Sequence, residues 1–516
     1  MSEPRVLLEL KDLRVTRGGK VELEPFSLLL HAGETVVLLG EAGSGKDAVL
    51  RTLGGFFERD EEAVGRLRVG DGEFQPVARR TKPALRTAYL PSATGNALDP
   101  RMSAAEQLSR VLARKLSCPK PAALEELRGA LARFDAAPSL ETIQAPVARL
   151  EPAAVAFGLL AAAAAATPEL LLCDHPMADL SPLAANRVTR ALLEEQTRQG
   201  FAIVYCAREP HPVVRLMART IVLRRGQVVE EGSAAHLIGG QTHPYTKSIF
   251  KALPADLARP PRAASRGEPL LQVQNLMLDA AHRRRDAIGF ELRRGAAMGL
   301  VGEPGSGRRR LLDAVLGLER RPGRVVFDAV DLNLLSETMA LRLRRRVAFV
   351  TSRDGALDPR MSLWDTVDEP LRAHLNLSRE LASDYRDNAL KRVGLASHDG
   401  RQAVSSLSPF DRRRLQIARA IVAAPLLVVV DEPLRALDAP AQSTIRDLLG
   451  EFRVESQAGF LVLTSDFSVA AALCDDALVF DKGRLVERGP IATLLAAPRE
   501  AATKALVEAA TLKPAA

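Results

Sequence analysis

The fold of this chain is decided by residues 35–46, which read TVVLLGEAGSGK. A short apolar run, the length of a buried strand, leads directly into a glycine-rich loop that ends on lysine, and a helix is expected to follow. This order of strand, Gly-x-x-x-x-Gly-Lys and helix is the pattern of a phosphate-binding loop. The glycines let backbone N–H groups turn inward around a phosphate, and the start of the helix adds its positive end.

The chain contains this pattern twice. Residues 297–308 read AMGLVGEPGSGR, 262 residues after the first copy when Gly302 is counted from Gly40. Two more blocks recur in the same order, ALDPRMS at 97–103 and 356–362, and LLLCD at 170–174 with LVVVD at 427–431. Three independent blocks at a nearly constant offset identify an internal duplication.

The duplication and the length of 516 residues predict two domains. We place the first at 1–258 and the second at 269–516, joined by a linker at 259–268 that is rich in proline, arginine and small residues. Buried apolar strands that alternate with helices predict an α/β fold with a central, mainly parallel sheet in each domain.

Bulk composition excludes several classes of protein. The hydrophobic fraction of 47% excludes wholesale disorder, and no apolar run approaches the ~18 residues of a membrane span. The start of the chain lacks a signal-peptide pattern, so we expect a cytoplasmic location. The net charge of +8 is spread along the chain without a long basic block, so no nucleic-acid partner is expected. A basic surface also suits anionic lipid headgroups.

The two loops supply the candidate nucleotide-binding residues, which are Gly40, Gly43, Ser44, Gly45, Lys46 and Asp47 in the first half and Gly302, Gly305, Ser306, Gly307, Arg308 and Arg309 in the second. Lys46 is expected to reach the β- and γ-phosphates. Asp47 stands where Ser or Thr normally holds Mg²⁺. Like charges ~4 Å apart repel by ~4 kcal/mol at an effective dielectric of ~20, so we expect weakened Mg-ATP binding. Arg309 cannot bind a metal.

Both halves resemble ATPase domains of the ABC family over nearly the whole chain. The first half ends with HPYTKS at 243–248, which is similar to the tail of ATPase subunits in oligopeptide, dipeptide and nickel importers, and the LDPRMS segments resemble the same subfamily. The resemblance implies two tandem P-loop nucleotide-binding domains, each with a helical subdomain, and ATP with Mg²⁺ as cofactors. It also implies that each ATP lies between one domain's P-loop and the other domain's signature motif.

The resemblance also assigns the acidic pair that follows a buried strand. In the second half Asp431 supports Mg²⁺ and Glu432 polarises the attacking water; in the first half Asp174 supports Mg²⁺, and His175 stands where the catalytic glutamate belongs. A positioned base contributes about 10²–10⁴-fold in rate, so its loss is a strong but not absolute one, since a neutral histidine can partly substitute.

The signature motif, Leu-Ser-Gly-Gly-Gln in the family, is reduced in both halves. The second half keeps its serine as Ser408 but loses both glycines, and the first half has Glu151 in place of the serine. Each expected ATP site joins the P-loop of one half to the signature motif of the other half. The site of the first P-loop thus combines Lys46 with Ser408, and the site of the second combines Arg308 with Glu151. Other family positions also differ, namely the Q-loop glutamine (Ser92, Ser352), the switch histidine (Arg208, Ser465) and the adenine-stacking aromatic (near Arg17 and Ala280).

Two functions follow from these patterns. The first is the ATP-binding, energy-coupling subunit of a bacterial peptide- or nickel-type ABC importer with impaired ATP sites. It would lie on the cytoplasmic face of the inner membrane, with membrane-spanning permease subunits, a solute-binding protein and a second ATPase subunit as candidate partners. The alternative is a structural or regulatory pseudo-ATPase that binds nucleotide weakly or not at all. Neither the heptads of chromosome proteins nor the charged helical linker of ribosome-binding ABC proteins is present, which sets that class aside.

Overall fold

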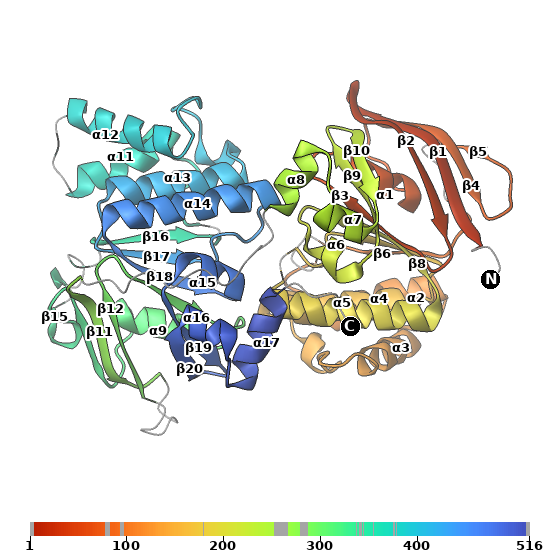
Figure 1. Cartoon of the computed structure of the whole chain (residues 1–516). Helices are drawn as coiled ribbons and strands as arrows, with labels where there is room; N and C mark the ends of the chain where they lie inside the picture. The colour runs from red at the N-terminus through yellow and green to blue at the C-terminus, as the bar shows by residue number, and fades with distance from the viewer. Residues whose placement is uncertain are drawn as a thin grey trace. The chain divides into compact units, whose positions relative to one another are not determined.

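The computed structural model describes residues 5–77, 83–92, 97–178, 180–251, 267–278, 287–336, 338–339, 343, 345–353, 355–374, 377 and 379–511 (Figure 1). The chain divides into two compact units, one formed by residues 1–253 and the other by Pro254–Thr511. Most of the predicted linker at 259–268 lies outside the described residues, so its exact bounds stay a prediction. None of the described helices is long and apolar enough to cross a membrane.

The first unit contains two sheets. The six-stranded sheet has the order β10-β9-β3-β8-β7-β6, and only the edge strand β10 runs antiparallel to its neighbour. A second, antiparallel sheet has the order β2-β1-β4-β5. The strands are β1 Val6–Arg17, β2 Lys20–His31, β3 Thr35–Leu39, β4 Glu61–Val69, β5 Gln75–Pro76, β6 Thr87–Leu90, β7 Leu170–Asp174, β8 Ala202–Ala207, β9 Arg219–Arg224 and β10 Gln227–Gly232.

The helices of the first unit pack on its parallel sheet or on one another. They are α1 Lys46–Gly54, α2 Ala104–Leu116, α3 Lys120–Ala132, α4 Pro152–Ala165, α5 Pro182–Gln199, α6 His211–Leu216, α7 Ala234–Gly239 and α8 Pro244–Phe250. Helices α2, α3 and α4 pack on one another as a helical subdomain. The central strands β3, β7 and β8 are apolar and buried almost throughout, as expected for parallel strands covered on both faces.

The second unit repeats this plan. Its sheets have the orders β16-β17-β18-β13-β19-β20 and β12-β11-β14-β15, and again only one edge strand of the larger sheet, β20, runs antiparallel. The strands are β11 Pro269–Leu276, β12 Ile288–Arg293, β13 Ala297–Val301, β14 Arg324–Phe327, β15 Val330–Asp331, β16 Val347–Thr351, β17 Leu427–Asp431, β18 Gly459–Thr464, β19 Asp476–Asp481 and β20 Arg484–Pro490. The helices are α9 Arg308–Val315, α11 Leu363–His374, α12 Arg379–Arg392, α13 Pro409–Val422, α14 Ala439–Ser456, α15 Phe467–Leu473, α16 Ile491–Ala496 and α17 Ala501–Ala510.

The duplication extends to unusual backbone conformations. His175 and Glu432, which follow β7 and β17, both have positive φ angles, 47° and 48°. Arg225 and Lys482, in the turns after β9 and β19, do the same at 50° and 46°. Non-glycine residues seldom adopt this left-handed region. Their occurrence at equivalent positions shows that the two halves share one backbone plan. The strand orders and mostly parallel pairings confirm the predicted α/β fold.

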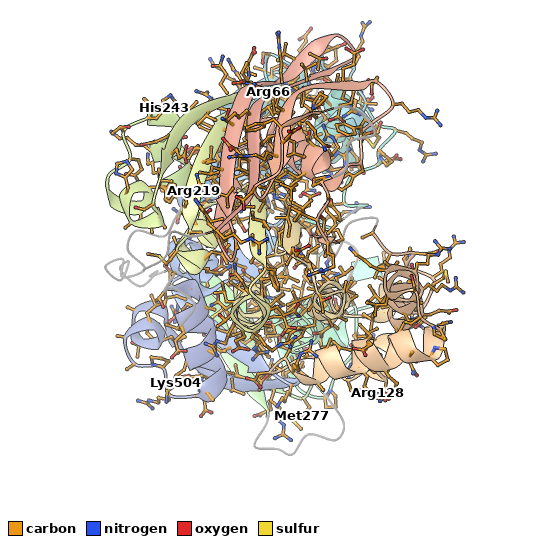
Figure 2. All side chains as sticks on the ribbon, turned by 90° about the vertical axis from the view of Figure 1, so that its right-hand side faces the viewer. Arg66, Arg128, Arg219, His243, Met277 and Lys504 are labelled. Carbon is orange, nitrogen blue, oxygen red and sulfur yellow. The ribbon has the colours of Figure 1, made fainter. Side chains whose placement is uncertain are left out.

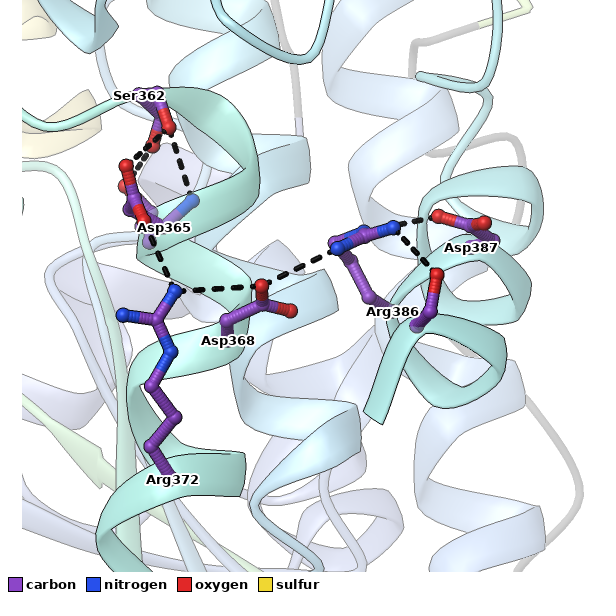
Figure 3. Close-up of polar contacts among 8 residues, drawn as sticks. Ser362, Asp365, Asp368, Arg372, Arg386 and Asp387 are labelled. Atoms are coloured by element: carbon purple, nitrogen blue, oxygen red, sulfur yellow. Dashed lines mark hydrogen bonds and ion pairs between the residues drawn. The ribbon is translucent and has the colours of Figure 1, made fainter. Parts of the chain in front are cut away.

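Charged contacts as well as apolar packing hold the second helical subdomain together (Figure 3). Arg386 of α12 contacts Asp368 of α11 through Nη1 at 3.2 Å. Its guanidinium also lies 4.7 Å from the centre of the Trp364 ring. Arg372 of α11 donates to Asp365 on its own helix at 2.9 Å. Apolar side chains of α11, α12 and α13 also form a buried core with residues of β16 and β17.

Candidate functional site

The two glycine-rich loops begin their helices through residues that only glycine suits. Gly45 and Gly307 precede α1 and α9 with φ angles of 97° and 99°. A Cβ atom on Gly45 would lie 2.9 Å from the carbonyl oxygen of Glu22, and one on Gly307 would lie 2.8 Å from the Cα of Gly483. Both the left-handed conformation and the close approach exclude a side chain. Each predicted loop therefore lies between a parallel strand and a helix, as the sequence indicated.

Lys46 is a fully buried cation in the first loop. Its ammonium donates to the carbonyl oxygen of Glu41 at 3.0 Å and lies 3.7 Å from Oδ1 of Asp47. An ammonium carries three donors. The residues described here take one of them as a hydrogen bond, which leaves the group suited to an anion such as a phosphate. The hydroxyl of Ser44, also buried, has no hydrogen-bond partner among the described residues.

Next to Lys46, Asp47, Asp174 and His175 form a compact cluster. Nε2 of His175 lies 3.7 Å from Oδ1 of Asp47 and 3.7 Å from Oδ1 of Asp174. These donor atoms all lie within 4.8 Å of one another. Asp174 ends β7, His175 follows it, and Asp47 is the second residue of α1. The fold thus brings together three residues that the sequence analysis assigned to the same site.

The charges of this cluster depend on burial and on the neighbouring cations. Burial lowers the pKa of the His175 imidazole; the Asp47 carboxylate opposes this, and Lys46 and Arg208 add to it. Burial by itself disfavours ionisation of Asp47, but His175, Lys46 and Arg208 hold the pKa of that carboxyl well below its usual range. At neutral pH the cluster therefore presents an ionised Asp47 carboxylate beside a His175 imidazole whose neutral form is favoured by burial.

Tyr89 of β6 completes the first site. Its hydroxyl donates to Oδ2 of Asp174 at 2.5 Å, and its ring packs edge-on against Phe56. Partial burial, together with this bond to Asp174, raises the pKa of Tyr89 above its ordinary value. The phenol therefore stays protonated and fixes the orientation of the Asp174 carboxylate. The sequence analysis did not include Tyr89.

In the second loop, Arg308 is paired with the residue expected to act as the base. Its Nη2 lies 2.6 Å from Oε1 of Glu432, and both side chains are largely buried. The same carboxylate oxygen accepts from the backbone N–H and the hydroxyl of Ser465, each at 2.9 Å. Oε2 accepts from the hydroxyl of Thr464 at 3.4 Å. Glu432 is thus engaged by an arginine, by Thr464 at the end of β18 and by Ser465 directly after that strand.

Asp431 of the second site is engaged in the same way. Arg309 reaches its Oδ2 through Nη1 at 3.3 Å, and Arg353 reaches the same atom through Nε at 2.9 Å. Arg413 of α13 is buried nearby, and burial lowers its pKa to about 10 although the charge of Asp431 opposes the shift. Guanidinium groups therefore take the place that a metal ion would hold beside this carboxylate.

The two sites differ in their fit to a divalent cation. In the first, two carboxylates and an imidazole converge, and oxygen donors of this kind suit Mg²⁺. In the second, the guanidinium of Arg309 stands at the position equivalent to Asp47 and contacts Asp431. A cation there would meet a positive charge instead of a ligand. The residues of the first site fit Mg²⁺, and those of the second do not.

The signature positions lie at helix starts in their own units. Ser408 is the N-cap of α13, where its hydroxyl accepts from the backbone N–H of Asp411 at 3.1 Å and lies 2.7 Å from that residue's Oδ2. Glu151 precedes α4 without a side-chain capping bond. Both residues are exposed. Ser408 is thus already used in a capping interaction, while the carboxylate of Glu151 faces solvent.

The tail at 243–248 forms α8 and contacts the first phosphate loop. The backbone N–H of Glu41 donates to the hydroxyl oxygen of Tyr245 at 2.9 Å, and Arg224 stacks on the Tyr245 ring at 4.7 Å from its centre. Glu230 of β10 anchors the start of the tail by accepting from the N–H of Thr242 at 2.7 Å. The tail therefore supports the loop that precedes Lys46.

The second half has an equivalent tail, although its sequence lacks the His-Pro-Tyr-Thr pattern of the first. Glu487 of β20 accepts from the backbone N–H groups of Arg499 and Glu500, at 3.0 and 3.1 Å, immediately before α17. Figure 2 labels His243 in the first tail and Lys504 in the second. The tyrosine position of the first tail corresponds to Ala502, so the hydroxyl that reaches the first loop has no counterpart here.

The repeated ALDPRMS segments have equivalent local structures. Asp99 and Asp358 each accept from a backbone N–H two residues later, at Arg101 and Arg360, both at 2.9 Å. Each segment ends on a serine that accepts from the helix following it, at Glu106 for α2 and at Asp365 for α11. The segments form the entries to the two helical subdomains.

The other positions at which the sequence differs from the family pattern do not share one environment. The backbone N–H of Ser352 donates to the carbonyl oxygen of Asp431 at 3.1 Å. Arg17, at the end of β1, lies 3.5 Å from Asp60. Ala280 lies outside the described residues, while Arg208 is exposed beside the first cluster.

Sequence reasoning missed Tyr89, Arg353 and the contact of Tyr245 with the first loop. Arg353 could have been found from its position, because it directly follows Ser352 at the Q-loop position. Tyr89 gave none, because a tyrosine in a short strand is usually a packing residue.

The family model described as ABC transporter matches residues 23–178 and 286–435. An uncharacterized ABC transporter ATP-binding protein YejF of Escherichia coli K12 is 28% identical and covers 93% of this chain and 94% of its own length. The peptidoglycan transport ATP-binding protein YejF of Agrobacterium fabrum is 29% identical, covering 98% and 96%. The glutathione import ATP-binding protein GsiA of Escherichia coli O6:H1 is 26% identical, covering 94% and 85%.

Proposed function

Because the chain belongs to the ABC transporter family, we propose that it is the ATP-binding, energy-coupling subunit of a bacterial importer of peptide-like solutes, with two impaired and unequal ATP sites. Its partners would be permease subunits in the inner membrane and a solute-binding protein, with a second ATPase subunit as a further candidate. The chain would lie on the cytoplasmic face of that membrane. The names of the YejF and GsiA relatives and the tail at 243–248 support this solute class.

The first site carries the case for nucleotide binding. Lys46 presents a buried ammonium behind a loop whose glycines adopt the turns that a phosphate cradle requires. Asp47 and Asp174 would hold Mg²⁺, which when bound neutralises charge on the phosphates. His175 stands at the position of the base, so we expect slow turnover at this site.

The single observation that carries the impairment is the ion pair between Arg308 and Glu432 at 2.6 Å. A base must be free to accept a proton from water within hydrogen-bond reach. Here its carboxylate is already occupied by a guanidinium and by Ser465, and its neighbour Asp431 is occupied by Arg309 and Arg353. The second site is therefore proposed not to hydrolyse ATP.

The second candidate function is a pseudo-ATPase that keeps the scaffold for a structural or regulatory task. The arginine contacts of the second site favour it specifically, since they hold the site together without nucleotide or metal. This candidate predicts nucleotide binding without turnover, whereas the importer motor predicts turnover once its permease partners are present.

The experiment that separates the two is Mg-ATP turnover by the purified chain, alone and with its permease subunits in liposomes. Lys46→Ala and Glu432→Gln serve as the site variants. Slow turnover that disappears in Lys46→Ala and persists in Glu432→Gln supports the importer subunit with one working site. The double variant Asp47→Ser/His175→Glu restores the family's residues and should raise turnover by roughly 10²-fold. No turnover under any of these conditions, with the permease present, would reject the motor and favour the pseudo-ATPase.

A further inference from the structure

The cluster of Asp47, Asp174 and His175 has the donor set of a transition-metal site. Two carboxylate oxygens and one imidazole nitrogen lie within 4.8 Å of one another on α1 and at the end of β7. The imidazole side chain is 7% exposed, and its Nε2 has no hydrogen-bond partner among the described residues. A buried polar atom without a partner is costly, because it has lost its bonds to water. A bound cation would satisfy it.

The distances are close to those of a formed site. Metal–ligand bonds to histidine and carboxylate are about 2.1 Å long, which places tetrahedral ligands about 3.4 Å apart. Nε2 lies 3.7 Å from each of the two Oδ1 atoms. Each carboxylate oxygen is therefore a few tenths of an ångström from the tetrahedral spacing to the imidazole nitrogen, and all three donor atoms lie within 4.8 Å of one another. Tyr89 holds Asp174 through its other oxygen, so Oδ1 remains directed at His175.

The nitrogen donor decides which metal class fits. Mg²⁺ prefers oxygen ligands in a near-ideal octahedron, whereas imidazole favours first-row transition ions such as Zn²⁺ and Co²⁺. Two cations face the two carboxylates, namely Lys46, whose ammonium lies 3.7 Å from Asp47, and the exposed Arg208. The converging donor atoms, and not an excess of negative charge, therefore favour a metal ion here. In the second half, Arg309 replaces Asp47, and the described residues there form no such cluster.

We propose that Asp47, Asp174 and His175 bind one transition-metal dication, of the Zn²⁺ or Co²⁺ class, in the absence of nucleotide. This differs from the Mg²⁺ that accompanies ATP, because all three ligands come from the protein and one is a nitrogen. The proposal does not rest on the transport role, since the site is complete without ATP or a partner.

The test is calorimetric titration of Zn²⁺ into the metal-free, full-length chain without nucleotide. We expect one Zn²⁺ per chain, bound at least a hundredfold more tightly than Mg²⁺. His175→Gln and Asp47→Ser should each weaken Zn²⁺ binding by at least tenfold. The matched control is His398→Gln, which removes a histidine that lies 3.7 Å from a single carboxylate, Asp411, and should leave binding unchanged.

Three outcomes would overturn the proposal: unchanged Zn²⁺ affinity in His175→Gln, equal loss in the His398→Gln control, or equal affinities for Zn²⁺ and Mg²⁺. A measurement on the wild-type chain covers the case in which a variant fails to fold. Pulsed electron paramagnetic resonance of the chain loaded with one Mn²⁺ should show coupling to an imidazole nitrogen. A signal with oxygen ligands alone would contradict the assignment of His175.

Discussion

Arg308 and Lys46 occupy the same place in their loops, but their charges go to different partners. The compact ammonium of Lys46 stays within its own loop at the Glu41 carbonyl, whereas the longer guanidinium of Arg308 extends to Glu432. Arginine presents five donors in a planar fork that matches a carboxylate, and lysine is a point charge on a flexible stem. Two residues of the same charge at equivalent positions therefore direct that charge to different partners, one to a carbonyl of the loop and the other to the Glu432 carboxylate.

The Arg308–Glu432 pair gives a prediction for stability. Arg308→Met should destabilise the second unit by roughly 3 kcal/mol, because removing one partner of a largely buried pair leaves the other charge uncompensated. Glu432→Gln should cost less, since Ser465 can still donate to an amide oxygen. The measurement is urea unfolding of the two single variants and of the double variant.

The double variant provides the control for this prediction. If the pair is coupled, the change in unfolding free energy of Arg308→Met/Glu432→Gln is smaller than the sum of the two single changes. Strict additivity would mean that the two side chains do not stabilise each other in solution.

At the scale of elements, α8 links the end of the first half to its phosphate loop. Tyr245→Phe removes the hydroxyl that accepts from the Glu41 N–H and leaves that donor without this partner. We expect a loss of about 1 kcal/mol in stability and weaker binding of a fluorescent ATP analogue. Tyr385→Phe, at a tyrosine of α12 that is 53% exposed, is the matched control and should change neither. Equal effects of the two variants would argue against support of the loop by the tail.

The anchor of the same tail predicts a pH dependence. Burial disfavours ionisation of Glu230, but the N–H groups of Thr242 and His243 and nearby hydroxyls lower its pKa from 4.5 to about 2. The ionised carboxylate therefore stabilises the fold fully above pH 4.5, and this stabilisation is lost as the pH falls from 4.5 towards 2. Urea unfolding should show Glu230→Gln less stable than wild type at pH 6, with the difference shrinking below pH 4.

The neighbouring Glu231→Gln is the control for Glu230. Its side chain is 47% exposed and pairs with Arg219 at the surface, so its effect should be small at every pH. A difference between Glu230→Gln and wild type that does not depend on pH would contradict the anchoring role.

The elements of both sites were predictable because glycine spacing and apolar runs depend on local physics. A strand, a loop with two left-handed glycines and a helix leave few alternatives, so the positions of Lys46 and Arg308 followed from sequence. The partners of those residues did not follow. That Arg308 meets Glu432, 124 positions away, depends on two strands of one sheet and on the reach of a side chain. The hydrophobic periodicity of the sequence does not indicate which strands are neighbours or how far a side chain extends.

The whole molecule is two compact units with one backbone plan and different residues at equivalent positions. This asymmetry predicts one bound nucleotide per chain, since Lys46 is available to a phosphate and Arg308 is engaged by Glu432. Equilibrium titration with a fluorescent ATP analogue should give a stoichiometry of one. Lys46→Ala should abolish that binding, and Arg308→Ala should leave it unchanged. Two equivalent sites per chain would contradict the prediction.

The presence of both units in one polypeptide also has a consequence for how the chain can change over generations. If the two units were separate proteins, the gene for each could be lost, duplicated or exchanged independently. An intact unit could then take the place of a damaged one when the two units assemble. Here the unit with Lys46 and the unit with Glu432 are always made in equal numbers and inherited together. Natural selection therefore acts on the pair as one unit, and each half has been able to diverge in a direction that the other half did not follow.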